Sequence, residues 1–104
     1  MACELAIDFA VKSDFLDCDS DSRREIGDFL LDLQGFPWPP GRHQRMSPHA
    51  LYAYYFQLPC GHFIAWEILG SEENLMKLTL LRDTCGITVR ILGVGREPRS
   101  ARPR

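Results

Sequence analysis

Hydrophobic and polar side chains alternate near the start of the chain, over residues 4 to 11. The hydrophobic positions are Leu5, Ile7, Phe9 and Val11. A period of two residues is typical of a half-buried strand, so the pattern predicts that a strand opens the fold. Ser13 and Asp14 then predict a short helical turn, which a polar stretch ends.

Helical spacing follows in residues 22 to 34, where the hydrophobic positions are Ile26, Phe29, Leu30 and Leu33. Ser22 and Glu25 have the spacing of a capping box, which predicts that the helix begins at Ser22. Gly35 and Pro37 predict its end, because glycine favours a helix C-terminus and proline cannot continue a helix.

Residues 35 to 48 contain four prolines and two glycines, which predicts a long connecting loop without regular structure. Beyond it, residues 49 to 58 and 62 to 69 alternate around a Pro-Cys-Gly turn, which predicts a hairpin. Residues 75 to 82 fit either a strand or two turns of helix, and we favour the strand. The β-branched residues of 87 to 94 predict a last strand inside the sheet.

The length of 104 residues fits one domain with a modest core. We predict a single α+β domain over residues 1 to 95. In it, an N-terminal strand and helix, or a short helical hairpin, pack on a mainly antiparallel sheet of three to five strands. Residues 96 to 104 hold four arginines and two prolines and are predicted to form a flexible basic tail.

Charge is distributed unevenly along the chain, although the net charge is only −2. Residues 1 to 34 carry nine acidic and three basic side chains, whereas residues 35 to 104 carry nine basic and five acidic ones. The basic half favours a nucleic-acid partner, while the low net charge argues against a dedicated nucleic-acid binder. No apolar run approaches the roughly 20 residues of a membrane helix, and the N-terminus lacks a signal peptide, so we expect a cytoplasmic protein without a membrane partner.

Four cysteines are present, at positions 3, 18, 60 and 85. In a cytoplasmic protein with a sufficient core we expect them to be reduced thiols. Cys60, His62 and Cys85 could be combined into a metal site, but they include no Cys-x-x-Cys pair and no fourth ligand is evident. We therefore predict no metal and no cofactor.

Two short motifs lie within this predicted order of strand, helix, proline-rich loop, aromatic hairpin and last strand. They are DFLLDLQGFP at residues 28 to 37 and ILGVGR at residues 91 to 96. Together they resemble the RelE/ParE superfamily of bacterial toxins, in which the last strand commonly ends in an I-L-x-V-G-x-R pattern. The resemblance implies a RelE-like fold and a toxin of a type II toxin–antitoxin system, silenced by a cognate antitoxin. It also implies one of two activities: ribosome-dependent cleavage of messenger RNA, or binding of a protein target such as DNA gyrase.

Three departures from the family pattern favour the protein-binding activity, or a non-catalytic protein-interaction module such as a degenerate toxin or phage-type accessory protein. Lys12 and Lys77 are the only lysines. No tyrosine follows Tyr55, and no histidine follows His62. The stretch of residues 71 to 86 is longer than the tight connection that such toxins have before the last strand.

RNA cleavage through the 2′-hydroxyl needs a base, a cation that stabilises the charged phosphorane, and an acid for the leaving oxygen. Arginine supplies only the cation, whereas histidine can supply the base or the acid. The candidate catalytic residues of an mRNA endoribonuclease are Arg42, His43, Arg45 and Arg96. Their alternative role is that of solvated surface charges, and catalysis requires the loop to fold close to Arg96.

Aromatic residues offer a second kind of surface. Trp38 could stack on a base or enter a partner's pocket, but we prefer that it fastens its loop to the core. Tyr52, Tyr54 and Phe56 share one strand face, and Tyr55 lies on the other. One face is expected to be core, and the other is a candidate surface for an antitoxin or a target.

Overall fold

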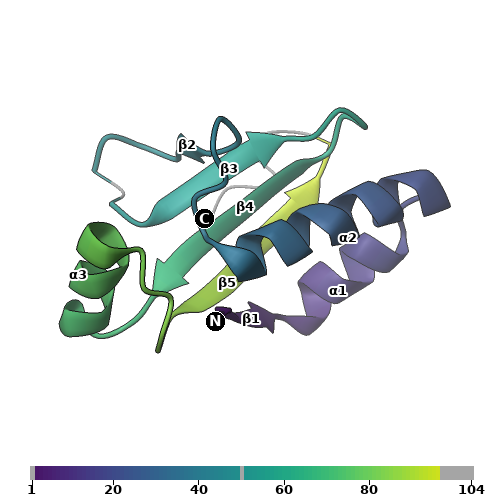
Figure 1. The fold of residues 1–104 in the computed structure, drawn as a ribbon. Coiled ribbons are helices and arrows are strands. Elements are labelled where there is room, and N and C mark those ends of the chain that lie inside the picture. The colour runs from purple at the N-terminus through teal and green to yellow at the C-terminus, as the bar shows by residue number, and fades with distance from the viewer. Residues whose placement is uncertain (1, 50, 97–104) are drawn as a thin grey trace.

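The computed structural model describes residues 2–49 and 51–96. Its elements in chain order are β1 (Glu4–Ile7), α1 (Phe9–Leu16), α2 (Ser20–Gly35), β2 (Gln44–Arg45), β3 (Ala53–Gln57), β4 (Phe63–Leu69), α3 (Glu72–Leu81) and β5 (Thr88–Gly95), as Figure 1 shows. The strands form one sheet in the order β1-β5-β4-β3-β2, in which β1 is parallel to β5 and the other pairs are antiparallel. This arrangement confirms the predicted α+β class with a mainly antiparallel sheet.

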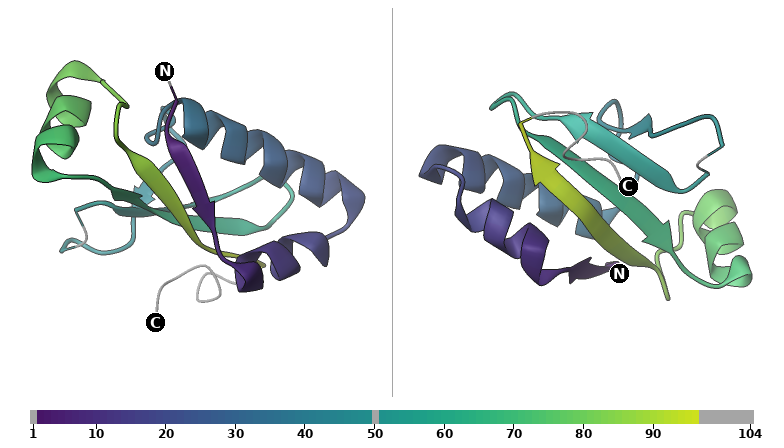
Figure 2. Two further views of the ribbon diagram at one scale, coloured as in Figure 1. Left: turned by 90° about the horizontal axis from the view of Figure 1, so that it is seen from below. Right: turned by 180° about the vertical axis from the view of Figure 1, so that it is seen from behind.

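The helices lie in two places relative to the sheet. Figure 2 shows α1 and α2 together on one face, while none of the described helices covers the opposite face. The helix α3 lies beyond the end of β4, on the excursion between β4 and β5. None of the described helices has the length and apolar character needed to cross a membrane.

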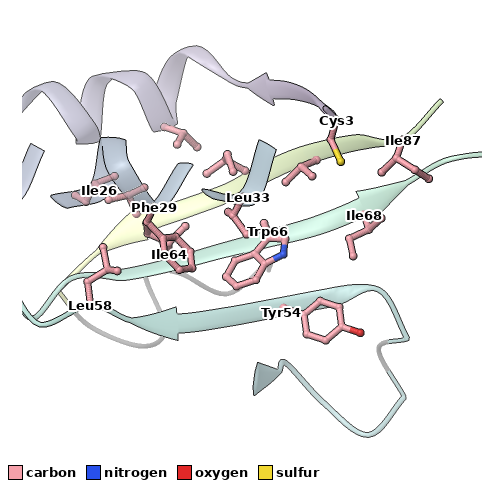
Figure 3. Close-up of a cluster of buried hydrophobic side chains, with 14 of the residues drawn as sticks. Cys3, Ile26, Phe29, Leu33, Tyr54, Leu58, Ile64, Trp66, Ile68 and Ile87 are labelled. Carbon is pink, nitrogen blue, oxygen red and sulfur yellow. The ribbon is translucent and has the colours of Figure 1, made fainter. Parts of the chain in front are cut away.

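The core fills the space between α2 and the sheet, as Figure 3 shows. At its centre Trp66 of β4 is fully buried, and its ring centroid lies 5.5 Å from that of Phe29 in α2 and 6.1 Å from that of Tyr54 in β3. The indole Nε1–H donates a hydrogen bond of 3.0 Å to the carbonyl of Pro37. One side chain therefore joins α2, two strands and the start of the proline-rich loop.

The predicted hairpin and last strand are confirmed. The strands β3 and β4 pair antiparallel from Ala53↔Glu67 to Gln57↔Phe63, and β5 lies between β4 and β1. Tyr54 belongs to the core, and Tyr52 and Phe56 pack against it. The strand face that these three residues share is therefore the core face, which confirms the prediction that one of the two faces is core. The paired segment is shorter than residues 49 to 58, because among the described residues of that stretch only Ala53–Gln57 has strand structure.

The first predicted strand is wrong beyond Ile7. Asp8 stands at the N-cap of α1, and Phe9, which alternation placed inside, is 86% exposed. The physical reason is that two periods compete in this stretch. Val11, Phe15 and Cys18 recur at helical spacing and contact the core, and this burial outweighs the strand pattern.

The start of α2 also differs from the predicted capping box. Asp19 is the N-cap, and its carboxylate accepts hydrogen bonds from Ser22 N–H (3.2 Å) and Ser22 Oγ–H (2.7 Å). Ser22 is therefore a buried first-turn residue, and Glu25 instead accepts a 3.0 Å hydrogen bond from Cys60 N–H. Asp19 is the stronger cap because a carboxylate near the helix N-terminus also faces the positive end of the helix dipole.

The strand favoured at residues 75 to 82 is wrong, because Glu72–Leu81 is the helix α3. Ser71 caps it by accepting a hydrogen bond from Asn74 N–H, and Glu72 and Glu73 lie in its first turn. The segment adds no strand between β4 and β5, since these pair directly with each other up to Leu69↔Thr88. The proline-rich loop also contains one short regular element, β2, which pairs with β3. Of the predicted tail at 96 to 104, residues 97 to 104 lie outside the described residues.

The Asp19 cap should make stability depend on acid pH. The hydrogen bonds from Ser22, assisted by Arg96, lower the pKa of Asp19. A lowered pKa in the folded state adds stability above the ordinary aspartate pKa, which is lost as pH falls through the lowered value. We expect Asp19→Ala to lower the melting temperature at pH 7, with a difference from wild type that shrinks below about pH 4. Thermal unfolding across this range checks it, with the exposed Asp28→Ala on the same helix as control; a pH-independent difference would contradict it.

The Trp66 hydrogen bond predicts different costs for two tryptophan substitutions. Trp66→Phe removes buried volume and leaves the Pro37 carbonyl without its donor, so we expect a loss of about 2 to 4 kcal/mol in unfolding free energy. Trp38 Nε1 has no hydrogen-bond partner within the described residues, so Trp38→Phe should cost only about 1 kcal/mol. Urea unfolding of both variants gives the comparison. Equal losses would show that the indole hydrogen bond contributes little.

Two glycines should respond to alanine in opposite directions. Gly86 has φ +74°, and a Cβ there would collide with the Asn74 side chain, so Gly86→Ala should destabilise by about 1 to 3 kcal/mol. Gly27 lies inside α2 with open space around its Cα, so Gly27→Ala should stabilise by about 0.5 to 1 kcal/mol. The same urea measurement tests both, and a tolerated Gly86→Ala would mean that the α3–β5 turn does not need this backbone conformation.

Candidate functional site: an aromatic and basic pocket

A pocket of about 580 Å³ opens where the proline-rich loop, β3 and α3 meet. Aromatic side chains form much of its wall, namely Phe36, Trp38, Tyr52 and Tyr54. Three cationic or titratable side chains share the lining: His43, Arg45 and Arg82. We call this site the aromatic pocket. Its residue types suit a ligand with flat rings and negative charge.

Trp38 forms part of the wall by packing on the protein itself. Its ring lies edge-on to those of Phe36 and Tyr54, at centroid distances of 5.9 and 6.3 Å. It is partly buried against the core. The preferred prediction, that Trp38 fastens its loop to the core, is therefore confirmed.

His43 is held in a fixed orientation by the same loop. Its Nδ1 lies 2.8 Å from the carbonyl oxygen of Pro39, which also accepts the Arg42 N–H. A carbonyl can only accept, so this contact assigns the proton of the neutral ring to Nδ1 and leaves Nε2 as the nitrogen that can take a proton. The ring stands edge-on to Tyr54 with a centroid distance of 5.5 Å. Two contacts, one to a carbonyl and one to a ring, therefore fix the orientation of His43.

Arg45 and Arg82 bring positive charge to the pocket from two directions. Arg45 is exposed on β2, opposite Tyr54 in the strand register. Arg82 ends α3 in a left-handed backbone conformation (φ 56°), and its guanidinium lies 4.2 Å from the centroid of the Phe36 ring. A cation over a ring face is attracted by the negative face of the π system. The pocket therefore combines two arginines that make no ion pair among the described residues.

Arg42 points away from the aromatic pocket. Its guanidinium forms a 3.0 Å ion pair with Asp32 and lies 5.5 Å from the Phe29 ring centroid. It lines a different depression together with Glu25, Asp28 and apolar residues such as Phe56. Arg42 therefore fastens the loop to α2.

Arg96 lies in another cleft, at the end of β5. That cleft is lined by Asp14, Asp17, Cys18, Asp19, His62, Val94, Gly95 and Arg96, and shares no residue with the aromatic pocket. An Arg96 nitrogen lies 3.9 Å from an Asp19 oxygen, at the surface. Of the four predicted site residues, the structure brings together His43 and Arg45, and it places Arg42 and Arg96 elsewhere.

Arg82 is not among the site residues predicted from the sequence, because the pattern of residues 75 to 82 favours a strand. The signal that could have found it is the Ser71 cap followed by Glu72 and Glu73, which marks a helix start. A ten-residue helix from there places Arg82, the C-cap residue that follows it, beside the aromatic pocket.

The sheet face opposite the helices carries a second, smaller group of aromatic and charged residues. The rings of Tyr55 and Phe63 lie 6.2 Å apart, and Arg90 forms a 3.2 Å ion pair with Glu67. Tyr55 thus lies on the face away from the core, where the sequence placed a candidate surface for a partner.

The cysteine and histidine residues considered for a metal do not form such a site. Cys85 is exposed, and within residues 2–49 and 51–96 no three His, Cys, Asp or Glu side chains are arranged so that they could hold a metal ion. All four cysteines are free thiols.

Comparison with known proteins places the fold. No family model and no curated protein sequence matches the chain. Among solved structures, the toxin RelE of E. coli, determined in the free state as a mutant with two arginines changed to alanine, is similar with a TM-score of 0.66 and 15% sequence identity. The similarity covers 96% of this chain and 88% of that one. The chain therefore has a RelE-like fold.

Proposed function

We propose that the protein is a RelE-like toxin of a type II toxin–antitoxin system, which arrests bacterial growth in the cytoplasm and is neutralised by a cognate antitoxin. The observation that carries this proposal is the similarity to E. coli toxin RelE across 96% of the chain. The aromatic pocket supports it, because it offers a place where a toxin of this fold can bind a target. The fold by itself does not define the chemistry, which depends on the site.

For the chemistry we propose cleavage of messenger RNA on the ribosome at the aromatic pocket. His43 Nε2 takes the proton of a ribose 2′-hydroxyl, whose oxygen then attacks the adjacent phosphorus. Arg45 and Arg82 stabilise the negative charge that develops on the phosphorane. The protonated His43 returns its proton to the leaving 5′-oxygen, which ends the cycle with the imidazole neutral. Trp38 and Tyr52 offer ring faces against which bases can stack.

The other two candidate residues take supporting roles in this proposal. Arg42 keeps the loop in place through Asp32, so that His43 stays against Tyr54. Arg96, 70% exposed at its side chain, contributes positive charge for the RNA backbone outside the pocket.

Induced expression in a bacterial host tests the proposal, with growth and the integrity of a translated message followed together. We expect wild type to arrest growth and cut the message, and His43→Asn to reduce cleavage about 100-fold while leaving folding intact. Arg45→Ala/Arg82→Ala should reduce cleavage about 10- to 100-fold. Lys77→Ala, an exposed neighbour on α3, is the matched control and should behave as wild type. Cleavage that is unchanged in His43→Asn would overturn the assigned role of the pocket.

A second candidate function is favoured by the pairing of the arginines. Arg42, Arg90 and Arg96 each form an ion pair with a carboxylate, which leaves less free positive charge for phosphates. This favours a toxin that binds a protein target such as gyrase, or a non-catalytic interaction module. In the same experiment, growth arrest with an intact message would support the protein target. Folded protein without any arrest would leave the interaction module.

A further inference from the structure

A histidine stands between two thiols where the α1–α2 turn meets the β3–β4 hairpin. His62 is 5% exposed. Its Nε2 lies 3.5 Å from Cys18 Sγ, and its Nδ1 lies 3.6 Å from Cys60 Sγ. Both distances are hydrogen-bond contacts for sulfur. We call these three residues the thiol cluster, which is separate from the aromatic pocket.

The hydrogen bonds assign a proton to each atom of the cluster. Cys18 Sγ–H donates to the carbonyl oxygen of Asp14 at 3.4 Å, so its sulfur accepts from His62 Nε2–H. The opposite nitrogen, Nδ1, then carries a lone pair. That lone pair faces Cys60 Sγ–H, which is its donor. The two thiols are therefore not equivalent, because in this arrangement only Cys60 has an imidazole lone pair as its neighbour.

The charged surroundings increase this difference. Burial first, and then the carboxylate of Asp19, raise the pKa of Cys18 and keep it a protonated thiol. The other charged groups in the adjoining cleft are Asp14, Asp17 and Arg96. Cys60 is partly exposed in the hairpin turn, and Glu25 fixes its backbone by accepting its N–H at 3.0 Å. Carboxylates thus outnumber cations next to the cluster, with three of them in the cleft beside Cys18 and Glu25 beside Cys60, which favours a cationic reagent over an anionic one.

We propose that Cys60 is a thiol-modification site that reacts with small, positively charged disulfides, with His62 as the general base. As Cys60 Sγ attacks one sulfur of the disulfide, its proton moves to His62 Nδ1. A bond forms between Cys60 and that sulfur, and the bond between the two reagent sulfurs breaks. The departing thiolate takes the proton from His62. Cys60 ends as a mixed disulfide and one equivalent of the reagent's thiol is released.

The test uses the full-length protein and cystamine, a small disulfide with two ammonium groups, and maps the adducts by peptide mass spectrometry over time. Cys85 is the internal control, because it is exposed and no imidazole contacts its sulfur among the described residues. We expect Cys60 to react about tenfold faster than Cys85, although Cys60 is less exposed. Adducts that form first on Cys85 or Cys18 would overturn the proposal, and this comparison needs no variant.

A variant then tests the role of His62. His62→Gln keeps polar atoms in the buried position, and we expect it to slow Cys60 about tenfold while the Cys85 rate stays the same. An unchanged Cys60 rate would remove His62 as the base and with it the proposed site. If the reaction rates of Cys60 and Cys85 change together, the variant has altered the fold. The comparison of the two rates in the wild-type protein then decides whether the proposal holds.

Discussion

The arrangement of the helix α2, the sheet and the proline-rich loop depends on the contacts of the Trp66 indole. Its ring packs on Phe29 of α2 and on Tyr54 of β3, and its N–H donates to the carbonyl of Pro37. A buried carbonyl without a hydrogen-bond donor is costly, so this hydrogen bond holds the start of the proline-rich loop in position next to β4. The aromatic pocket follows from the same contact, because Tyr54 is both a neighbour of Trp66 and a wall of the pocket next to His43.

The elements that could be predicted from the sequence are those whose burial follows one period. The hairpin and the last strand alternate around buried side chains such as Ile64 and Val89, so pattern and structure agree. Prediction failed where apolar residues fit two periods. Val11 and Leu78 are buried side chains of helices, not of strands. In α3 the signal that identifies the helix is polar, namely the N-cap at Ser71.

The candidate site could be predicted only in part, for a related reason. His43 and Arg45 are two residues apart and both line the aromatic pocket, whereas the adjacent Arg42 turns to Asp32, so closeness in sequence predicted only part of this grouping. Arg82 comes from a distant element whose type was misjudged. Which end of the sheet the proline-rich loop reaches, and at which end the last strand finishes, depends on the topology of the whole fold. Local patterns therefore could not predict that Arg96 lies apart from that loop.

The placement of α3 has a consequence for how this protein can change over evolution. Residues 70 to 87 connect β4 to β5. Because these two strands pair directly, their pairing does not depend on the surface that this connection presents. The entropy of closing such a connection grows only slowly with its length, so insertions on its exposed side are tolerated, whereas the buried Leu78 and the positive-φ Gly86 are constrained. Leu78 is buried, whereas Met76, Leu80 and Leu81 are exposed. The outer side of α3 can therefore acquire new residues, and with them new specificity beside the pocket, while the folding of the sheet is preserved.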